Sequence, residues 1–225
     1  MTSLGLMLQT NSNHKEQYVM YCSKIVFKMG RNIKDDIFGG GYKQPINQKA
    51  KGNRNELVVC KVLEEWVGEP FARVPSSGGL RWKDFNNAVG DVVCQNSKFP
   101  FAFVIETKHL KSYAVDKTLR SNSKFFTIYE RQAKPDAIRA KKLPMLLIRK
   151  NGMPEGEYNL VIESEISDYL DLHDYEFSGC TTGEDGELIR LRGWNSKKFF
   201  KKYTYAWVLA ELQELVKGKR INIEL

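Results

Sequence analysis

The chain has 225 residues, of which 42% are hydrophobic and 28% charged, as is ordinary for a globular protein with one sizeable core. These values exclude a disordered or fibrous chain. The most apolar stretch, Phe99 to Ile105, contains a proline and is far too short to span a bilayer. The amino terminus lacks a basic region ahead of its short apolar patch, so we expect a cytoplasmic protein with no membrane partner.

The four cysteines are scattered without any C-x-x-C pair. This spacing argues against zinc-ribbon and thioredoxin-like sites and fits reduced thiols.

Charge is distributed unevenly along the chain, whose formal net charge is +8. Residues 1–55 hold nine basic and three acidic residues, residues 107–150 hold twelve and three, and residues 151–195 hold two and eleven. Such segregation favours a polyanionic partner, although on charge alone a solvated charged surface is the alternative.

The first half of the chain begins with a segment that lacks periodicity. Residues 1–50 contain three consecutive glycines and several amides, and we expect a basic, partly flexible arm. The pattern from Asn55 to Trp66 predicts a helix, which Gly68 and Pro70 end. The short apolar runs 90–94 and 101–106 predict a β-hairpin.

The second half begins with a predicted helix from Lys124 to Ala140, in which Pro135 either kinks the helix or starts a second piece. Leu143–Arg149 and Tyr158–Ile162 predict two more strands, and a last helix is expected at about Lys197 to Lys217. Helices and strands alternating in this way predict a mixed α/β fold.

Glu56 stands out within the first predicted helix. Helical spacing places it on the same face as Val59, Cys60 and Leu63, which should be buried. An unpaired carboxylate there is costly, so a cation, a donor or a metal should hold it at the edge of the core. A first-turn glutamate that only favours the helix dipole is the alternative.

The predicted hairpin brings further charges together. Because side chains alternate along a strand, Glu106 and Lys108 share one face, and Asp91 begins the strand expected to pair with theirs. Two neighbouring carboxylates repel, and a divalent cation with oxygen ligands relieves this repulsion. A common surface ion pair between Glu106 and Lys108 is the alternative.

Five short motifs occur in order along residues 51–165: Lys51-Gly52 with Glu56, Ser76-Ser77-Gly78, Gly90-Asp91, Glu106-Thr107-Lys108, and Gln132. This series resembles the PD-(D/E)xK nuclease superfamily, most closely its cellular and phage Holliday-junction resolvases. The resemblance implies a restriction-endonuclease-like α-β-β-β-α-β core with a central mixed sheet. We therefore expect a basic arm (1–50), a nuclease core (51–165) and a C-terminal extension ending in a helix (166–225). The sequence departs from the pattern at Gly90, where many members have proline.

Carried over to this chain, the resemblance assigns roles to individual residues. Asp91 and Glu106 would bind a magnesium ion, which manganese could replace, with the Thr107 carbonyl as a further ligand. Glu56 would bind metal or order water at a second position. Lys108 would orient the attacking water or stabilise charge on the phosphorus. Ser77 and Gln132 join the catalytic candidates, although a turn serine and an exposed helix glutamine need no such function.

His109 follows the lysine, but strand alternation turns it away from the Glu106 face, so we expect it to be structural or solvated. Trp82 lies between two basic residues in the loop before Asp91, where a nucleic acid would approach. The residues expected to contact DNA are Lys51, Arg54, Ser76, Arg81, Trp82, Lys83, Lys111 and Arg131.

Together these features predict a magnesium-dependent endonuclease that acts on branched DNA in recombination or repair, most simply a four-way junction. Resolving a junction requires two symmetric nicks, which implies a homodimer. One alternative is a restriction-like or homing-type endonuclease that cuts duplex DNA. Another is a non-catalytic DNA-binding accessory protein, although clustered acids beside a lysine argue against it.

Overall fold

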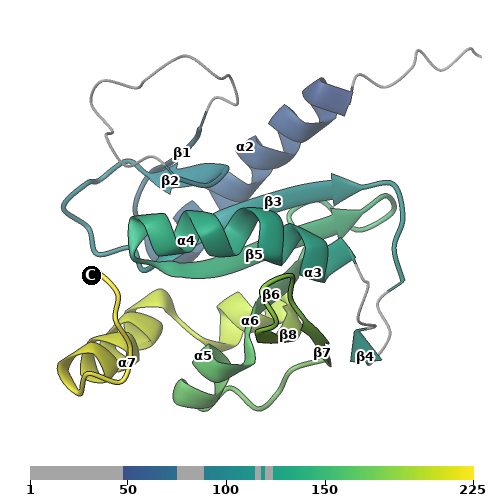
Figure 1. Cartoon of the computed structure of the whole chain (residues 1–225). Coiled ribbons are helices and arrows are strands. Elements are labelled where there is room, and N and C mark those ends of the chain that lie inside the picture. Colours follow the sequence, from purple (N-terminus) through teal and green to yellow (C-terminus); the bar gives the residue numbers. More distant parts are fainter. Residues whose placement is uncertain (1–47, 75–88, 115–117, 120–123) are drawn as a thin grey trace, which may run out of the picture. The chain divides into compact units, whose positions relative to one another are not determined.

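Figure 1 shows a computed structural model of the chain, which describes residues 48–74, 89–114, 118–119 and 124–225. All of these residues belong to one compact unit, Asn47–Leu225. None of the helices described is both long and apolar enough to cross a membrane.

The described elements follow the order helix, strands, helix, strands, helices. They are α2 (Gln48–Val67), β1 (Phe71–Arg73), β2 (Val92–Cys94), β3 (Phe103–Leu110), β4 (Thr118–Leu119), α3 (Lys124–Ile128), the π-helical segment η1 (Tyr129–Ala133), α4 (Lys134–Ala140), β5 (Leu143–Lys150), β6 (Asn159–Glu163), α5 (Ser164–Tyr169), β7 (Phe177–Thr182), β8 (Leu188–Asn195), α6 (Ser196–Lys202) and α7 (Tyr205–Lys217).

The described strands form one eight-stranded sheet in the order β1-β2-β3-β5-β6-β8-β7-β4. Strand β3 is parallel to β5, whereas β2 and β6 are antiparallel to their neighbours. The helical segment from α3 to α4 makes the crossover between the two parallel strands, as parallel pairing requires, and lies across them (Figure 1). The predicted mixed α/β fold, with an α-β-β-β-α-β core, is confirmed.

Helices cover both faces of the sheet, and strand β5 shows why. Met145 and Leu147 pack in the apolar cluster that includes α2 and α7, whereas Leu146 and Ile148 pack in the cluster formed with α3 and η1. All four side chains are completely buried. A strand buried on both faces reads as a continuous apolar run, which the sequence of β5 shows.

The structure divides two of the predicted helices. Pro135 lies in the first turn of α4, directly after the five-residue π-helical segment, and therefore starts a second piece. The single helix expected at about 197–217 is wrong, because the chain breaks into α6 and α7. Thr204 is extended and caps α7 by accepting a hydrogen bond from the Trp207 amide, which a helix interior would not allow.

The part of the chain after residue 165 contains strands that the periodicity did not indicate. Strand β8 pairs with β6 along five residues, from Leu191 to Asn195, and β7 pairs with β8. The segment expected as an extension thus contributes two strands to the same sheet as the core.

Candidate active site

Asp91 is held beside β3 by an unusual turn. Gly90 has a φ of +88°, and a Cβ atom added to it would lie 2.7 Å from the Ile105 carbonyl oxygen. Glycine alone adopts this conformation without strain, and proline, fixed at a φ of about −65°, cannot adopt it. The next amide, that of Asp91, donates to the same Ile105 oxygen at 2.8 Å. The turn therefore explains why glycine stands before this aspartate.

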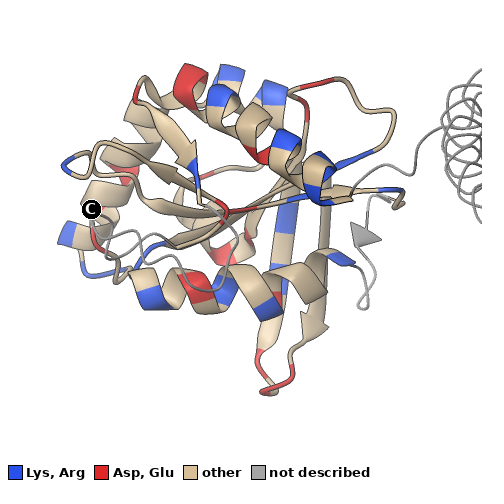
Figure 2. Ribbon diagram, turned by 90° about the horizontal axis from the view of Figure 1, so that it is seen from above, with Lys and Arg blue, Asp and Glu red and all other residues tan. Residues whose placement is uncertain are grey.

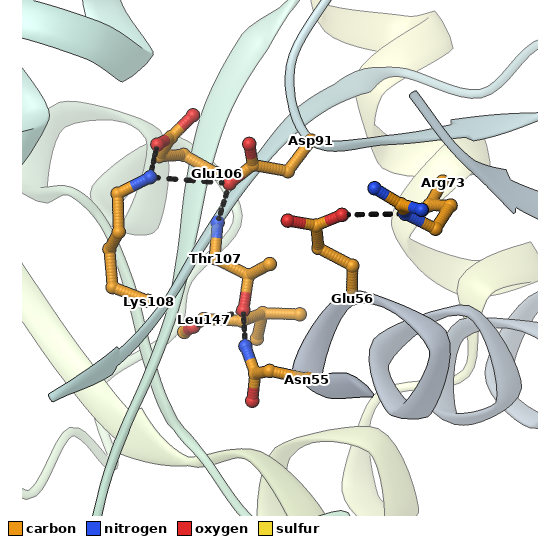
Figure 3. Close-up of polar contacts among 8 residues, drawn as sticks. All are labelled: Asn55, Glu56, Arg73, Asp91, Glu106, Thr107, Lys108 and Leu147. Carbon is orange, nitrogen blue, oxygen red and sulfur yellow. Dashed lines mark hydrogen bonds and ion pairs between the residues drawn. The ribbon is translucent and has the colours of Figure 1, made fainter. Parts of the chain in front are cut away.

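Glu106 and Lys108 project from the same face of β3, as alternation requires, and meet the Asp91 carboxylate (Figure 3). The Lys108 ammonium contacts Glu106 Oε1 and lies 3.5 Å from Asp91 Oδ2. The Thr107 amide donates to the same Asp91 oxygen at 2.8 Å. One lysine thus bridges two carboxylates that come from different parts of the chain.

The electrostatics of this trio reflect its partial burial. The side chain of Glu106 is only 6% exposed, whereas those of Asp91 and Lys108 are 23% and 31% exposed. Burial, and then the nearby Asp91 carboxylate, raise the pKa of Glu106 to about 7. Burial lowers the pKa of Lys108, but the two carboxylates outweigh it, and the net pKa lies above its usual value. The site therefore favours additional positive charge.

Glu56 lies at the edge of the core on α2, with its side chain 14% exposed. Its Oε2 accepts a hydrogen bond from Arg73 Nε at 2.9 Å, and the guanidinium also donates to Asn53 Oδ1 at 3.0 Å. Figure 3 shows the Glu56 carboxylate between Asp91 and Arg73. A cation supplied by β1 thus holds this glutamate.

A buried polar chain lies directly behind the trio. Asn55 Nδ2 donates to Thr107 Oγ1 at 2.8 Å, and Thr107 Oγ1 donates to the Leu147 carbonyl oxygen at 2.8 Å. The Tyr158 hydroxyl donates to Asn55 Oδ1 at 3.3 Å. These contacts fix α2 against the strand that carries Glu106 and Lys108. Sequence reasoning missed Asn55, although a polar residue four positions before Val59, in the apolar stripe, was the available signal.

The carboxylates of the trio are suitable ligands for a hard divalent cation such as magnesium, but Glu56 does not join them. Asp91 and Glu106 offer carboxylate oxygens, the ligands that magnesium prefers, and they share a local excess of negative charge that Lys108 offsets in part. Within the described residues, however, no group of three or more His, Cys, Asp or Glu side chains is gathered tightly enough to hold a metal. Glu56 therefore does not complete a three-carboxylate site in this arrangement, because Arg73 holds it.

The other predicted site residues lie in different surroundings. Gln132 is exposed in η1, and Lys111 is exposed just after β3. Arg131 is exposed and paired with Glu184 at 2.5 Å, and Arg54 with Glu155 at 3.1 Å. Lys51 is half-buried and donates to Asn151 Oδ1 at 2.7 Å. The predictions for Ser76, Ser77, Arg81, Trp82 and Lys83 fall outside the described residues.

His109 belongs to the opposite face of β3 from Lys108. It is level with Arg149 on β5, and burial, followed by the cations Lys51 and Arg149, lowers its pKa. This placement separates the imidazole from the Glu106 carboxylate.

Comparison with known families gives a match over much of the chain. A family model described as "Phage putative PDDEXK endonuclease" matches residues 47–178, which is more than half of the chain and spans the elements from α2 into β7. No curated protein and no solved structure matches the chain.

Proposed function

The chain belongs to the phage family of PDDEXK endonucleases and is thus a nuclease, and from this premise we propose that it cuts branched DNA in the cytoplasm, most simply a four-way junction, with the help of magnesium. The observation that carries the proposal is the Lys108 ammonium, which bridges Asp91 and Glu106. A lysine that is held by two carboxylates and is partly exposed to solvent is suitably placed for phosphodiester hydrolysis.

In this proposal each member of the trio has a separate task. Asp91 and Glu106 would hold the divalent cation, with the Thr107 carbonyl as a further ligand. A bound magnesium ion lowers the pKa of its water and offsets charge on the phosphate. Lys108 would donate a hydrogen bond to the attacking water or to a phosphate oxygen, which its 31% exposure allows.

The residues around the trio would support it. Glu56, held by Arg73, would orient water at the edge of the site, and Gln132 would donate a hydrogen bond from η1. Ser77 stays a prediction for the loop before Asp91.

Cations near the trio support DNA as the substrate class. Lys51 and Arg54 lie on α2, whose neighbouring residue Asn55 contacts β3, and Lys111 follows the catalytic strand directly. Basic residues placed in this way contact phosphates without reading bases. This pattern fits recognition of DNA shape rather than sequence.

A four-way junction has two strands to be cut in a symmetric manner, and we propose a homodimer that presents two sites. A restriction-like enzyme that cuts duplex DNA is the second candidate, since the same trio would serve it equally well. A non-catalytic binder would have no need of a buried carboxylate at Glu106 close to that of Asp91, because like charges repel.

The test is a cleavage assay with labelled four-way junctions of two unrelated sequences and the matching linear duplexes, in magnesium or EDTA. Paired nicks in both junctions, absent from the duplexes and absent in EDTA, are expected. Cutting of the duplexes at one sequence would favour the restriction-like candidate. Tight binding without cutting of any substrate would contradict the proposed activity.

A further inference from the structure

Two side-chain nitrogens in the described residues are buried without any hydrogen-bond partner, and they belong to neighbouring strands. They are Nε2 of His109 and Nε of Arg149. The two residues occupy level positions on the parallel strands β3 and β5. The His109 side chain also has a hydrogen bond to Asn151. Buried polar atoms without partners are rare in proteins, and two on neighbouring strands indicate a site for a ligand that supplies partners.

Arg149 is a buried cation, and within the described residues no carboxylate forms an ion pair with it. The residue is only 9% exposed, and its guanidinium is a cation with five N–H groups. Its Nη2 donates to the Met153 carbonyl oxygen at 2.6 Å, and the guanidinium also contacts Tyr158, with Cζ 5.7 Å from the centre of the ring and a side-chain hydrogen bond to the tyrosine. An arginine buried without a counter-charge is costly.

The surroundings add positive charge and leave a route for a ligand. Lys51 approaches from α2 and donates to Asn151, two positions after Arg149. Glu155, an acidic residue between β5 and β6, is already paired with Arg54. Lys51 and His109 are both half-buried, so part of the cluster is open to solvent.

We infer that Arg149, His109 and Lys51 form a binding site for a phosphate group, filled by a backbone phosphate of the DNA. A guanidinium matches the spacing of phosphate oxygens, and an imidazole N–H and an ammonium complete the donors. Lys108 and His109 are consecutive residues on opposite faces of β3, so the site lies across the sheet from the trio, on the face that α2 covers. The identity of this phosphate as DNA rests on the proposed function.

The test replaces the charge without leaving a cavity, in the variant Arg149→Met. Thermal unfolding is followed with and without inorganic phosphate, and DNA binding is followed by fluorescence anisotropy in EDTA at several salt concentrations. Phosphate should raise the unfolding temperature of the wild type and not that of Arg149→Met. The variant should bind DNA about tenfold more weakly. The slope of log affinity against log salt concentration should be less steep by about one, as expected for the loss of one phosphate contact.

The control is Lys217→Met, which removes one exposed charge at the end of α7 and should keep the phosphate response. Without phosphate, Arg149→Met should unfold at the wild-type temperature or above it, since a buried unpaired charge has been removed. The inference would be overturned by an unfolding temperature well below that of the wild type, with the phosphate response and the salt dependence unchanged. Arg149 would then only stabilise the turn at Met153.

Failure of the phosphate site and failure of the nuclease proposal give different results. If the wild type binds no DNA but loses its phosphate response in Arg149→Met, the phosphate site stands and its assignment to DNA is overturned. Should Arg149→Met not fold, Arg149→Lys provides the same test, because it keeps the charge and loses the paired donors. A full phosphate response in Arg149→Lys, with unchanged DNA affinity, would contradict the inference.

Discussion

At the scale of single residues, Gly90 decides where the Asp91 carboxylate lies. Its positive φ, and the Ile105 carbonyl oxygen 2.7 Å from an added Cβ, leave no room for a side chain. Gly90→Ala should therefore lower the free energy of unfolding by about 2 kcal/mol, and nuclease activity should fall with it because Asp91 moves. Urea unfolding and cleavage rates measure the two effects, and an active variant of wild-type stability would show that the turn is adaptable.

The hydroxyl of Thr107 makes a second prediction at this scale. Thr107→Val keeps the shape of the side chain but leaves the amide of the buried Asn55 without its acceptor. The variant should lose about 1–3 kcal/mol of unfolding free energy, the usual cost of an unsatisfied buried donor.

The double variant Asn55→Ala/Thr107→Val provides the control. Because both partners are removed together, the double variant should lose less unfolding free energy than Asn55→Ala and Thr107→Val lose in sum. Additive losses, measured by urea unfolding, would mean that the two side chains act independently.

At the scale of elements, an acidic turn pairs with a basic helix. The turn between β7 and β8 carries Glu184 and Glu187, which form ion pairs with Arg131 and Lys134 of the α3–α4 helical segment. Figure 2 shows acidic residues at the tip of this hairpin, beside the helix. The hairpin thus occupies two cations that could otherwise contact phosphates.

The double variant Glu184→Gln/Glu187→Gln should therefore bind DNA severalfold more tightly, with a steeper salt dependence, because Arg131 and Lys134 become free. Its stability should change by only about 0–1 kcal/mol, as expected for exposed pairs. Glu214→Gln, which breaks an exposed pair on α7, is the control and should not change DNA affinity. Equal affinities for all three proteins, measured by anisotropy, would mean that these cations do not face the DNA.

At the scale of the whole molecule, the sheet extends beyond the segment that the family model matches. That match ends at residue 178, within β7, whereas β8 lies between β6 and β7 and buries Leu191 and Trp194. A chain ending at residue 178 loses this strand and exposes the edge of β6. We expect it not to fold, because the apolar surface that β8 covers would face water.

Circular dichroism and thermal unfolding of the truncated chain test this expectation. A cooperative transition close to that of the full chain would show that the matched segment is an independent domain.

The sequence allowed prediction of those parts in which local pattern and tertiary structure agree. The apolar runs of β3 and β5 are short and bounded by turns, and the order of the motifs placed Asp91 and Glu106 on neighbouring strands. Strands β7 and β8 escaped prediction because residues such as Cys180 and Leu188 are hydrophobic but exposed, and they break a clean alternation of apolar and polar residues in the sequence.

The surroundings of the site were harder to predict than the trio itself. Arg73 pairs with Glu56 and Arg149 lies level with His109 of β3, and both of these partners are distant in sequence. Neither spacing nor helix periodicity relates such residues, because β1 and β5 come to their positions only when the sheet forms. The sequence therefore indicated acids and a lysine, but not the arginines beside them.

The measurement that tests the central claim most directly is single-turnover cleavage of a labelled pool of junction, duplex and single-stranded DNA by the wild type and by Asp91→Asn. Magnesium is compared with EDTA, and Asp171→Asn, which changes an exposed aspartate outside the trio, is the control. We predict cleavage in magnesium by the wild type and the control, and a loss of about 10³-fold in Asp91→Asn with DNA binding retained. Cleavage by Asp91→Asn at the wild-type rate, or cleavage that persists in EDTA, would contradict the account.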